Sequence, residues 1–373
     1  MRIVASLILL CSVACGTGDP AALEADSTRE AADSAFVAAL RAQLATVAAA
    51  GKFSGAVLVT RDGHTLFEGA YGLADRDRLV PNTPHTQFRV GSMYKMVTAV
   101  ATLQLVQAGA VRLDAPLGTY LPDYPNAEVA STVTPHHLLT HTGGTGDIFG
   151  PEFMARRLEL RTTEDYLHLY GRRGPEFTPG TRHVYSNYGF MLLGAVIERV
   201  SGTSYDDHVA AHVLVPAGMT ATGTAPEDSL VPGRSVGYMP DTSRALVSNA
   251  PTLPYRGTPS GGGYATVGDF ARFAVAVRER RLLDPAHTAL LLSGKVAVYP
   301  GMRYAYGFMD RILGGRRFVG HGGAAPGISG ELAFEPEGGY VIVVLSNLEP
   351  PAADWALSFI ANRLPTPAQS GGG

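Results

Sequence analysis

Ser92 and Lys95 could act together as a nucleophile and its base, because they lie three residues apart at the predicted start of a helix. Residues at positions i and i+3 of a helix share one face, so the hydroxyl and the amine can meet. The positive end of the helix dipole favours an alkoxide on the serine, and burial would lower the pKa of the amine. The opposing interpretation is an N-cap serine followed by a surface lysine, since serine is a preferred cap.

Lysine is rare in this chain, which makes Lys95 stand out. Of the 30 Lys and Arg residues only three are lysine, at positions 52, 95 and 295. Arginine stays charged at any accessible pH, whereas a lysine amine can lose its proton and serve as a base. The composition therefore favours a role for Lys95 that an arginine could not fill.

Two later segments carry groups that could complete such a site. Tyr185 and Asn187 offer a phenol, which a nearby ammonium could help to ionise, and an amide that could donate to a substrate carbonyl. His321, Gly322 and Gly323 follow at the end of a predicted strand, where paired glycines would let a substrate backbone approach closely.

Taken in order, these segments resemble the three motifs of the serine β-lactamase and penicillin-binding-protein superfamily. The resemblance is to the branch of class C β-lactamases, DD-peptidases, D-aminopeptidases and related esterases, and it spans about residues 53–363. It rests on SMYK (92–95), YSN (185–187) and HGG (321–323), supported by PHHLLTHTGG (135–144), YSNYGFMLLGAVIERVSG (185–202), PAGMTAT (216–222) and GGGYATVGDF (261–270).

The resemblance implies a role for each matching residue. Ser92 would attack a carbonyl and become acylated, and Lys95 would take its proton. Tyr185 would act as the partner base and deliver a proton to the leaving group. Asn187 would hold the substrate, and the backbone NH groups of Ser92 and Ala324 would form the oxyanion hole. The resemblance implies no cofactor.

The third motif departs from the β-lactamases of this branch, which usually have lysine where this chain has His321. Histidine there resembles the DD-peptidases, D-aminopeptidases and some esterases. With an unperturbed pKa of ~6.5 it would be mostly neutral at pH 7 and would attract a substrate carboxylate less strongly than lysine. Together with Gly322 and Gly323, it is expected to bind substrate.

The expected activity is hydrolysis of small esters, amides, D-amino-acid peptides or β-lactams through an acyl-serine. An alternative is a penicillin-binding or sensor protein that acylates with little turnover, and a third is a relative with an inactive site. A formal charge of −3 and the lack of a long basic run argue against a nucleic-acid partner. Metal binding is not expected at His208 and His212, because no acidic partner accompanies them. At His136, His137 and His141 it is not expected either, because a loop typical of the family explains this cluster without a metal.

The N-terminal segment has the features of an export signal. Residues 1–14 form a short apolar run after one arginine, and Ser12 to Cys15 resembles a bacterial lipobox. We therefore predict a signal peptide over 1–14, lipidation of Cys15, and a flexible tether over 15–30. The protein would be exported to the periplasm or cell surface and anchored there by lipid, and the sequence leaves the oligomeric state open.

The remaining pattern predicts one α/β (α+β) domain over residues 31–365 with a β-lactamase-like fold. An antiparallel sheet of five or more strands, made from both chain ends and flanked by helices, would carry a mostly helical insertion over about 113–259. Residues 366–373 are expected to be a disordered tail. The predicted helices cover 31–50, 92–109 and 352–363, and the predicted strands cover 54–60, 65–71, 304–313, 317–320, 329–334 and 340–346.

Overall fold

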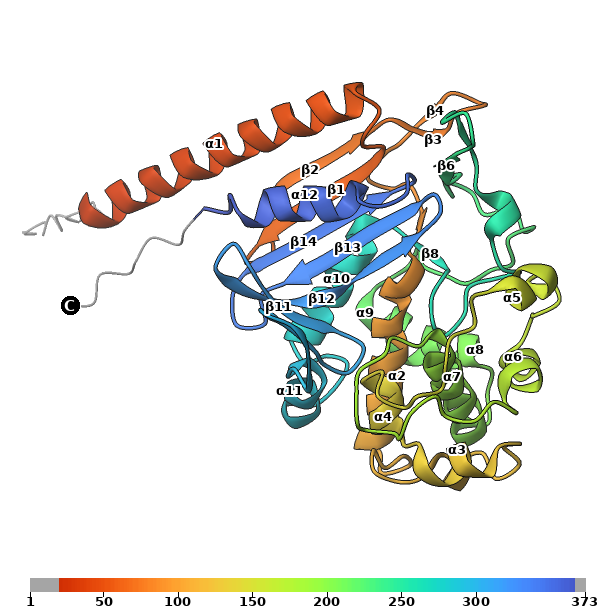
Figure 1. Ribbon diagram of the computed structural model, residues 1–373. Coiled ribbons are helices and arrows are strands. Elements are labelled where there is room, and N and C mark those ends of the chain that lie inside the picture. The colour runs from red at the N-terminus through yellow and green to blue at the C-terminus, as the bar shows by residue number, and fades with distance from the viewer. Residues whose placement is uncertain (1–19, 366–373) are drawn as a thin grey trace, which may run out of the picture.

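The computed structural model describes residues 20–365 (Figure 1). The predicted signal peptide, the lipidation site at Cys15 and the predicted tail over 366–373 lie outside the described residues. Within residues 20–365, no helix is both long enough and apolar enough to cross a membrane.

An eight-stranded antiparallel sheet forms the centre of the fold and confirms the predicted sheet built from both chain ends. Its strand order is β2-β1-β14-β13-β12-β11-β10-β9, so the first hairpin pairs directly with the last strand. Its strands are β1 (Gly55–Arg61), β2 (His64–Tyr71), β9 (Val296–Tyr299), β10 (Met302–Tyr304), β11 (Met309–Leu313), β12 (Arg316–Ala325), β13 (Ile328–Phe334) and β14 (Tyr340–Ser346). Three short pairs lie outside it: β3 (Leu73–Asp75) with β4 (Val80–Pro81), β5 (Phe88–Arg89) with β8 (Tyr264–Ala265), and β6 (Tyr238–Pro240) with β7 (Leu246–Ser248).

The predicted hairpin at the start of the sheet closes through a two-residue turn. Arg61 pairs with His64, and the intervening Asp62 and Gly63 both have positive φ, of 51° and 81°. An Asp-Gly pair tolerates this left-handed backbone, which matches the twist of a hairpin. The turn therefore fixes the register of β1 and β2.

Helices cover both faces of the sheet, because the side chains of its central strands are buried on each side. Along β1, Val57 and Val59 pack with α1 (Pro20–Ala49) and α12 (Ala352–Ala361), whereas Ala56 and Leu58 face the core that holds α2 (Lys95–Gln107) and α10 (Val267–Arg278). This alternation follows from the period of two in a strand. Figure 1 shows α1 and α12 on one side of the sheet and α2 and α10 on the other.

The predicted helical insertion lies beside the sheet and contributes the helices drawn in yellow and green in Figure 1. Within 113–259 the only regular strands are β6 and β7, each three residues long. The helices of this region are α3 (Ala127–Thr132), α4 (Pro135–Leu139), α5 (Pro151–Arg156), α6 (Thr163–Tyr170), α7 (Asn187–Ser201), α8 (Tyr205–Val209) and α9 (Val215–Ala217), and α11 (Pro285–Leu292) follows later in the chain.

The predicted tether over residues 15–30 is wrong for residues 20–30, because α1 already begins at Pro20. This stretch contains several alanine and glutamate residues, which are strong helix formers. The body of α1 is held on the sheet by Phe36, Leu40 and Leu44, and Asp33 accepts a hydrogen bond of 2.8 Å from Arg61. The helix is thus longer than predicted and packs along its C-terminal part.

Candidate active site

Ser92 lies in a short 3-10 turn, Gly91–Tyr94, that leads directly into α2. The turn makes no side-chain cap, and α2 begins at Lys95 rather than at Ser92 as predicted. Gly91 has a φ of 52°, a left-handed conformation that favours glycine. The interpretation of Ser92 as an N-cap beside a surface lysine is therefore wrong.

Lys95 is fully buried and its amine is directed at Ser92. Its Nζ lies 3.2 Å from the Ser92 Oγ and 2.7 Å from the Asn187 Oδ1, and it also donates to the backbone carbonyl of Ser260. Burial lowers the pKa of Lys95 to about 7, although the nearby Asp147 carboxylate opposes this change. A substantial fraction of the amine is therefore neutral near pH 7 and can accept a proton.

Asp147 fixes the orientation of Asn187. Its carboxylate accepts hydrogen bonds from the backbone NH of Asn187 at 3.2 Å and from the side-chain Nδ2 at 3.0 and 3.1 Å. The amide oxygen must then face Lys95, which is the contact observed. One Nδ2 proton remains for a substrate, since Asp147 engages the other.

Tyr185 stands on the other side of Lys95, with the amine 4.8 Å from its ring centroid. Its hydroxyl is buried and, among the described residues, has no hydrogen bond of good geometry. Burial raises the pKa of Tyr185, and the nearby Ser92 oxygen opposes this rise only in part. The expectation that a lysine ammonium would help to ionise this phenol is therefore wrong for the resting site, where the phenol keeps its proton.

The glycines of the third motif let β12 pack tightly against its neighbours. A Cβ on Gly323 would lie 2.0 Å from the Val90 carbonyl oxygen, and one on Gly322 would lie 2.4 Å from a carboxylate oxygen of Glu331. This close packing against protein atoms, rather than room for a substrate backbone, accounts for both glycines. The backbone NH of Ala324, the second predicted oxyanion donor, lies next to the turn that carries Ser92. A Cβ built on Gly91, the residue before Ser92, would lie 3.3 Å from the Ala324 nitrogen.

The free edge of β12 faces the Ser92 turn. Strand β11 pairs with β12 only up to Gly320, so the last residues of β12 have a strand neighbour on one side alone, which is β13. The 3-10 turn contacts β12, and a Cβ on Gly91 would lie within 3.4 Å of both Gly323 and Ala324, so the turn lies against this unpaired part of the strand. The segments that carry Ser92 and Ala324 are therefore neighbours, and the oxyanion hole stays a prediction.

His321 has only 1% of its surface exposed, and both of its ring nitrogens are occupied by protein groups. The Nε2 lies 2.9 Å from the Tyr304 hydroxyl, and the Nδ1 lies 2.5 Å from the Gly322 carbonyl oxygen. Burial, followed by the charge of Lys95, lowers the pKa of His321 to about 3. The ring is neutral, as expected from the sequence, but this geometry does not support the predicted direct contact with a substrate.

The sequence did not predict four of the residues that contact Lys95, Asn187 and His321 or lie behind them. Asp147 orients Asn187, Ser260 binds Lys95 through its carbonyl, and Tyr304 and His141 lie behind His321. The His141 and Tyr185 rings are 4.1 Å apart. The partners of Lys95 are 92 and 165 residues away from it, and His141 is 163 residues from Tyr304, so no local spacing identifies them.

The histidines considered for metal binding have other neighbours. His136 Nδ1 lies 2.8 Å from the Tyr306 hydroxyl, and the rings of His208 and His212 are 4.5 Å apart. In the part of the chain from residue 20 to residue 365, no three His, Cys, Asp or Glu side chains are grouped so that they could hold a metal ion.

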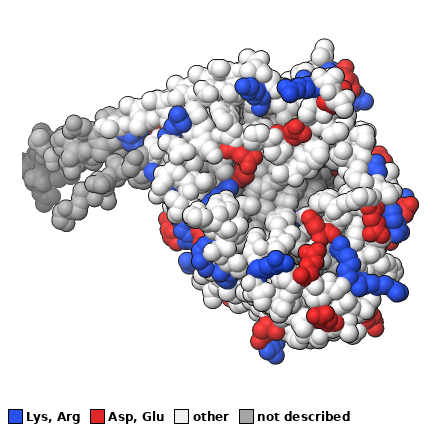
Figure 2. All heavy atoms as spheres, in the orientation of Figure 1, with Lys and Arg blue, Asp and Glu red and all other residues white. Residues whose placement is uncertain are grey.

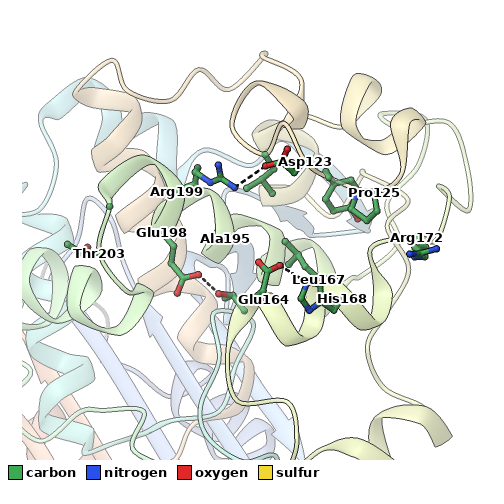
Figure 3. A pocket seen from close by; sticks show the side chains of 14 residues that line it. Asp123, Pro125, Glu164, Leu167, His168, Arg172, Ala195, Glu198, Arg199 and Thr203 are labelled. Atoms are coloured by element: carbon green, nitrogen blue, oxygen red, sulfur yellow. Dashed lines mark hydrogen bonds and ion pairs between the residues drawn. The ribbon is translucent and has the colours of Figure 1, made fainter.

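The surface is hollowed where the N-terminal end of α2 meets the ends of the central strands (Figures 1 and 2). A separate pocket of about 840 Å³ lies in the helical region, where Glu164, Leu167 and Ala195 line it together with the Asp123–Arg199 ion pair (Figure 3). None of the residues around Ser92 lines this pocket. The candidate site is therefore the hollow at α2.

The chain is similar to known proteins over most of its length. Residues 36–364 match the model of the family described as Beta-lactamase. The chain is 31% identical to penicillin-binding protein 4 of Amycolatopsis lactamdurans, over 78% of this chain and 79% of that protein. It is 31% identical to the esterase EstB of Burkholderia gladioli, over 79% and 83%. A penicillin-binding protein structure from Bacillus halodurans superposes with a TM-score of 0.78 at 33% identity, covering 85% of this chain and 98% of that one.

Proposed function

Since this chain belongs to the Beta-lactamase family of serine hydrolases, we propose that it cleaves small esters and amides through an acyl-enzyme on Ser92. The observation that carries the proposal is the buried Lys95 amine, 3.2 Å from the Ser92 Oγ and with its pKa lowered to about 7. D-amino-acid peptides and β-lactams contain the same kind of acyl bond and belong to the proposed substrate range.

In the acylation step, Ser92 attacks the substrate carbonyl carbon while its proton passes to the neutral Lys95 amine. The resulting ammonium is accommodated by the Asn187 amide oxygen, the Ser260 carbonyl and the nearby Asp147 charge. The oxyanion that forms is stabilised by the backbone NH groups of Ser92 and Ala324.

Collapse of the tetrahedral intermediate requires a proton on the leaving group. Tyr185 supplies it from its hydroxyl, which is protonated at rest and has no other partner of good geometry among the described residues. The Lys95 ammonium then returns a proton to the phenolate. Water attacks the acyl-Ser92 ester in the second half of the cycle, with the same groups working in reverse, and releases the acid.

A relative supports the choice of esters. One similar protein is named an esterase, and another is named a penicillin-binding protein. His321 supports slow rather than fast penicillin hydrolysis, because a neutral imidazole offers no charge to the carboxylate that penicillins carry.

The test uses the wild-type protein, Ser92→Ala and a matched control, Ser131→Ala, which alters an exposed serine of α3. A fluorophosphonate probe and a fluorescent penicillin are expected to label the wild type and the control but not Ser92→Ala. Steady-state rates with a p-nitrophenyl ester, a chromogenic cephalosporin and a D-Ala-D-Ala peptide then rank the substrates. Unchanged activity in Ser92→Ala would remove Ser92 as nucleophile, and labelling without turnover of any substrate would favour a penicillin-binding or sensor role.

We further propose export and lipid anchoring through Cys15, on the basis of the N-terminal sequence. Expression in a bacterial host with labelled palmitate is expected to give a labelled membrane-associated protein. Cys15→Ala should abolish the label, whereas Cys11→Ala should keep it. A mature protein that starts after residue 15 and carries no lipid would show ordinary signal cleavage instead.

A further inference from the structure

A continuous chain of hydrogen bonds runs from the second motif to the third. The backbone NH of Ser186 donates to His141 Nδ1 at 3.1 Å, and His141 Nε2 lies 3.0 Å from the Tyr304 hydroxyl. The same hydroxyl lies 2.9 Å from His321 Nε2, and His321 Nδ1 lies 2.5 Å from the Gly322 carbonyl oxygen. The chain thus begins at a backbone donor and ends at a backbone acceptor.

The two ends fix the direction of every bond between them. A backbone NH can only donate, so His141 Nδ1 must be bare and its Nε2 must carry the proton. This Nε2–H donates to the Tyr304 oxygen, and the Tyr304 O–H donates to His321 Nε2. The single proton of a neutral His321 is then on Nδ1, where it meets the Gly322 carbonyl, which can only accept.

Protonation of His321 would break this order. An imidazolium has a donor at each nitrogen, so Tyr304 would face donors from both histidines and its own proton would have no partner in a site where Tyr304 is 1% exposed. A buried hydroxyl proton without a partner is unfavourable. The hydrogen-bond pattern alone therefore favours neutral His321.

The groups around the two rings act in the same direction. His321 is faced by Lys95 from α2, by Tyr185 and Tyr304, and by Arg311 from β11, and burial and the cations lower its pKa. Around His141, burial comes first and the charge of Lys95 second, and both lower its pKa as well. The buried carboxylate nearest to His321 in sequence pairing, that of Glu331 on β13, accepts a hydrogen bond from Arg311.

We propose that Tyr304, held by His141, is a positioning residue that keeps His321 as a neutral imidazole with its proton on Nδ1. The third motif then offers no cation to the substrate. The site therefore selects substrates that have no carboxylate next to the bond that is cleaved. This inference rests on the proposed function for its substrate class, while its claim about the imidazoles stands independently. The preferred substrates are neutral esters and amides, and carboxylate-bearing analogues are disfavoured.

The imidazole claim is tested by nitrogen NMR on protein labelled with ¹⁵N-histidine, with the signal of each ring assigned by its absence in His141→Asn or His321→Asn. We expect His321 to be protonated on Nδ1 and His141 on Nε2, and neither to titrate between about pH 5.5 and about pH 8. The opposite tautomer at either ring, or a titration of His321 in this range, would overturn the proposal.

The role of Tyr304 is tested with Tyr304→Phe against Tyr306→Phe. The control removes the hydroxyl of a second tyrosine–histidine pair, Tyr306 with His136, which is not part of the chain. Tyr304→Phe should shift the His321 Nε2 resonance toward that of an imidazole nitrogen that accepts no hydrogen bond. It should also lower kcat/KM for a neutral ester about fivefold, which is the effect of one lost hydrogen bond. Tyr306→Phe should do neither, and equal changes in the two variants would contradict a specific role for Tyr304.

The substrate claim is tested with p-nitrophenyl butyrate and its carboxylate analogue, mono-p-nitrophenyl glutarate. Both reactions require neutral Lys95, so the titration of Lys95 changes both kcat/KM values by the same factor. The ratio of the two values is therefore independent of Lys95 and reports on the charge of other groups near the substrate. We expect the neutral ester to be favoured at least about tenfold, with a ratio that is flat from about pH 5.5 to about pH 8.

His321→Lys should lower the ratio of kcat/KM for the neutral ester to kcat/KM for the carboxylate ester about tenfold, because it places a cation in the third motif. A wild-type ratio that shifts toward the carboxylate substrate at low pH would overturn the substrate claim. Failure of the protein to cleave either ester would instead count against the proposed function, and the NMR result would still decide the state of His321.

Discussion

Replacing Gly323 with alanine should separate the two halves of the oxyanion hole. The added Cβ would lie 2.0 Å from the Val90 carbonyl oxygen and 3.2 Å from Met93 Cγ. Val90 directly precedes the 3-10 turn that carries Ser92, and Gly323 directly precedes Ala324. The clash therefore pushes apart the two elements that carry the proposed backbone donors, the NH groups of Ser92 and Ala324.

The size of the effect follows from the overlap. Ordinary van der Waals contact begins near 3.4 Å, so β12 and the Ser92 turn must move apart by about 1.4 Å, the difference between 3.4 and 2.0 Å. The obstacle is backbone, which cannot rotate away as a side chain could. A misplacement of about 1 Å can lower a rate about 100-fold, and the loss of one oxyanion donor has a similar effect. We expect kcat/KM of Gly323→Ala to fall about 100-fold.

The assay measures ester hydrolysis and the rate of fluorophosphonate labelling, with a thermal melt to verify that each variant is folded. Gly174→Ala is the matched control, because it lies on the surface and its new Cβ would meet only the Asn126 amide at 3.8 Å. The control should behave as the wild type. A folded Gly323→Ala protein that keeps its kcat/KM within about threefold would refute the steric argument and the placement of the oxyanion hole.

Three further outcomes follow from the described contacts. The kcat/KM for a neutral ester should rise with pH through about 7 as Lys95 loses its proton, and a rate that is flat between about pH 5.5 and about pH 8.5 would contradict its role as base. Asp147→Asn removes a charge that favours the ammonium, so the same pH profile should move about one unit toward acid, whereas an unmoved profile would contradict this coupling. Asp269 is fully buried and accepts from the Ala221 NH at 3.0 Å and from the Thr222 hydroxyl at 2.6 Å. Asp269→Ala should lower the free energy of unfolding in urea by about 3 kcal/mol, and a loss below about 1 kcal/mol would show that these contacts contribute little.

The sequence predicts the parts of the fold that depend on local patterns. The β1 and β2 hairpin is marked by an Asp-Gly turn between β-forming runs, and the last helix is marked by its apolar period. The edge strand β9 is absent from the sequence prediction, and the single strand predicted over 304–313 is two in the structure, β10 and β11. Strands β9 and β10 are only four and three residues long and lie among glycine and proline, so they leave little pattern in the sequence. The extension of α1 back to Pro20 was missed because a polar, alanine-rich segment satisfies the composition of a linker as well as that of a helix.

The contacts of the site also fall into those that are local in sequence, which a pattern can predict, and those that are distant, which it cannot. Ser92 and Lys95 are close in sequence, so helix geometry alone brings them together, and the structure gives their 3.2 Å contact. His141 and Tyr304 are 163 residues apart and meet only when the helical insertion packs on the sheet. Whether His321 binds substrate directly or stands behind the site is decided by these distant partners, so no pattern within the third motif could distinguish the two.

The position of β14 has a consequence for how the protein acquires its activity during synthesis. This strand lies between β1 and β13, and all seven of its residues are buried. Its residue Ser346 pairs with Gly55 of β1, which lies 291 residues earlier in the chain (346 − 55). A nascent chain that ends after Phe334 already contains the serine, lysine, tyrosine and histidine of all three motifs but lacks the strand that joins the two ends of the sheet. Ribosome-bound or prematurely terminated chains should therefore be inactive, and closure of a loop this long makes the final pairing a late event in folding.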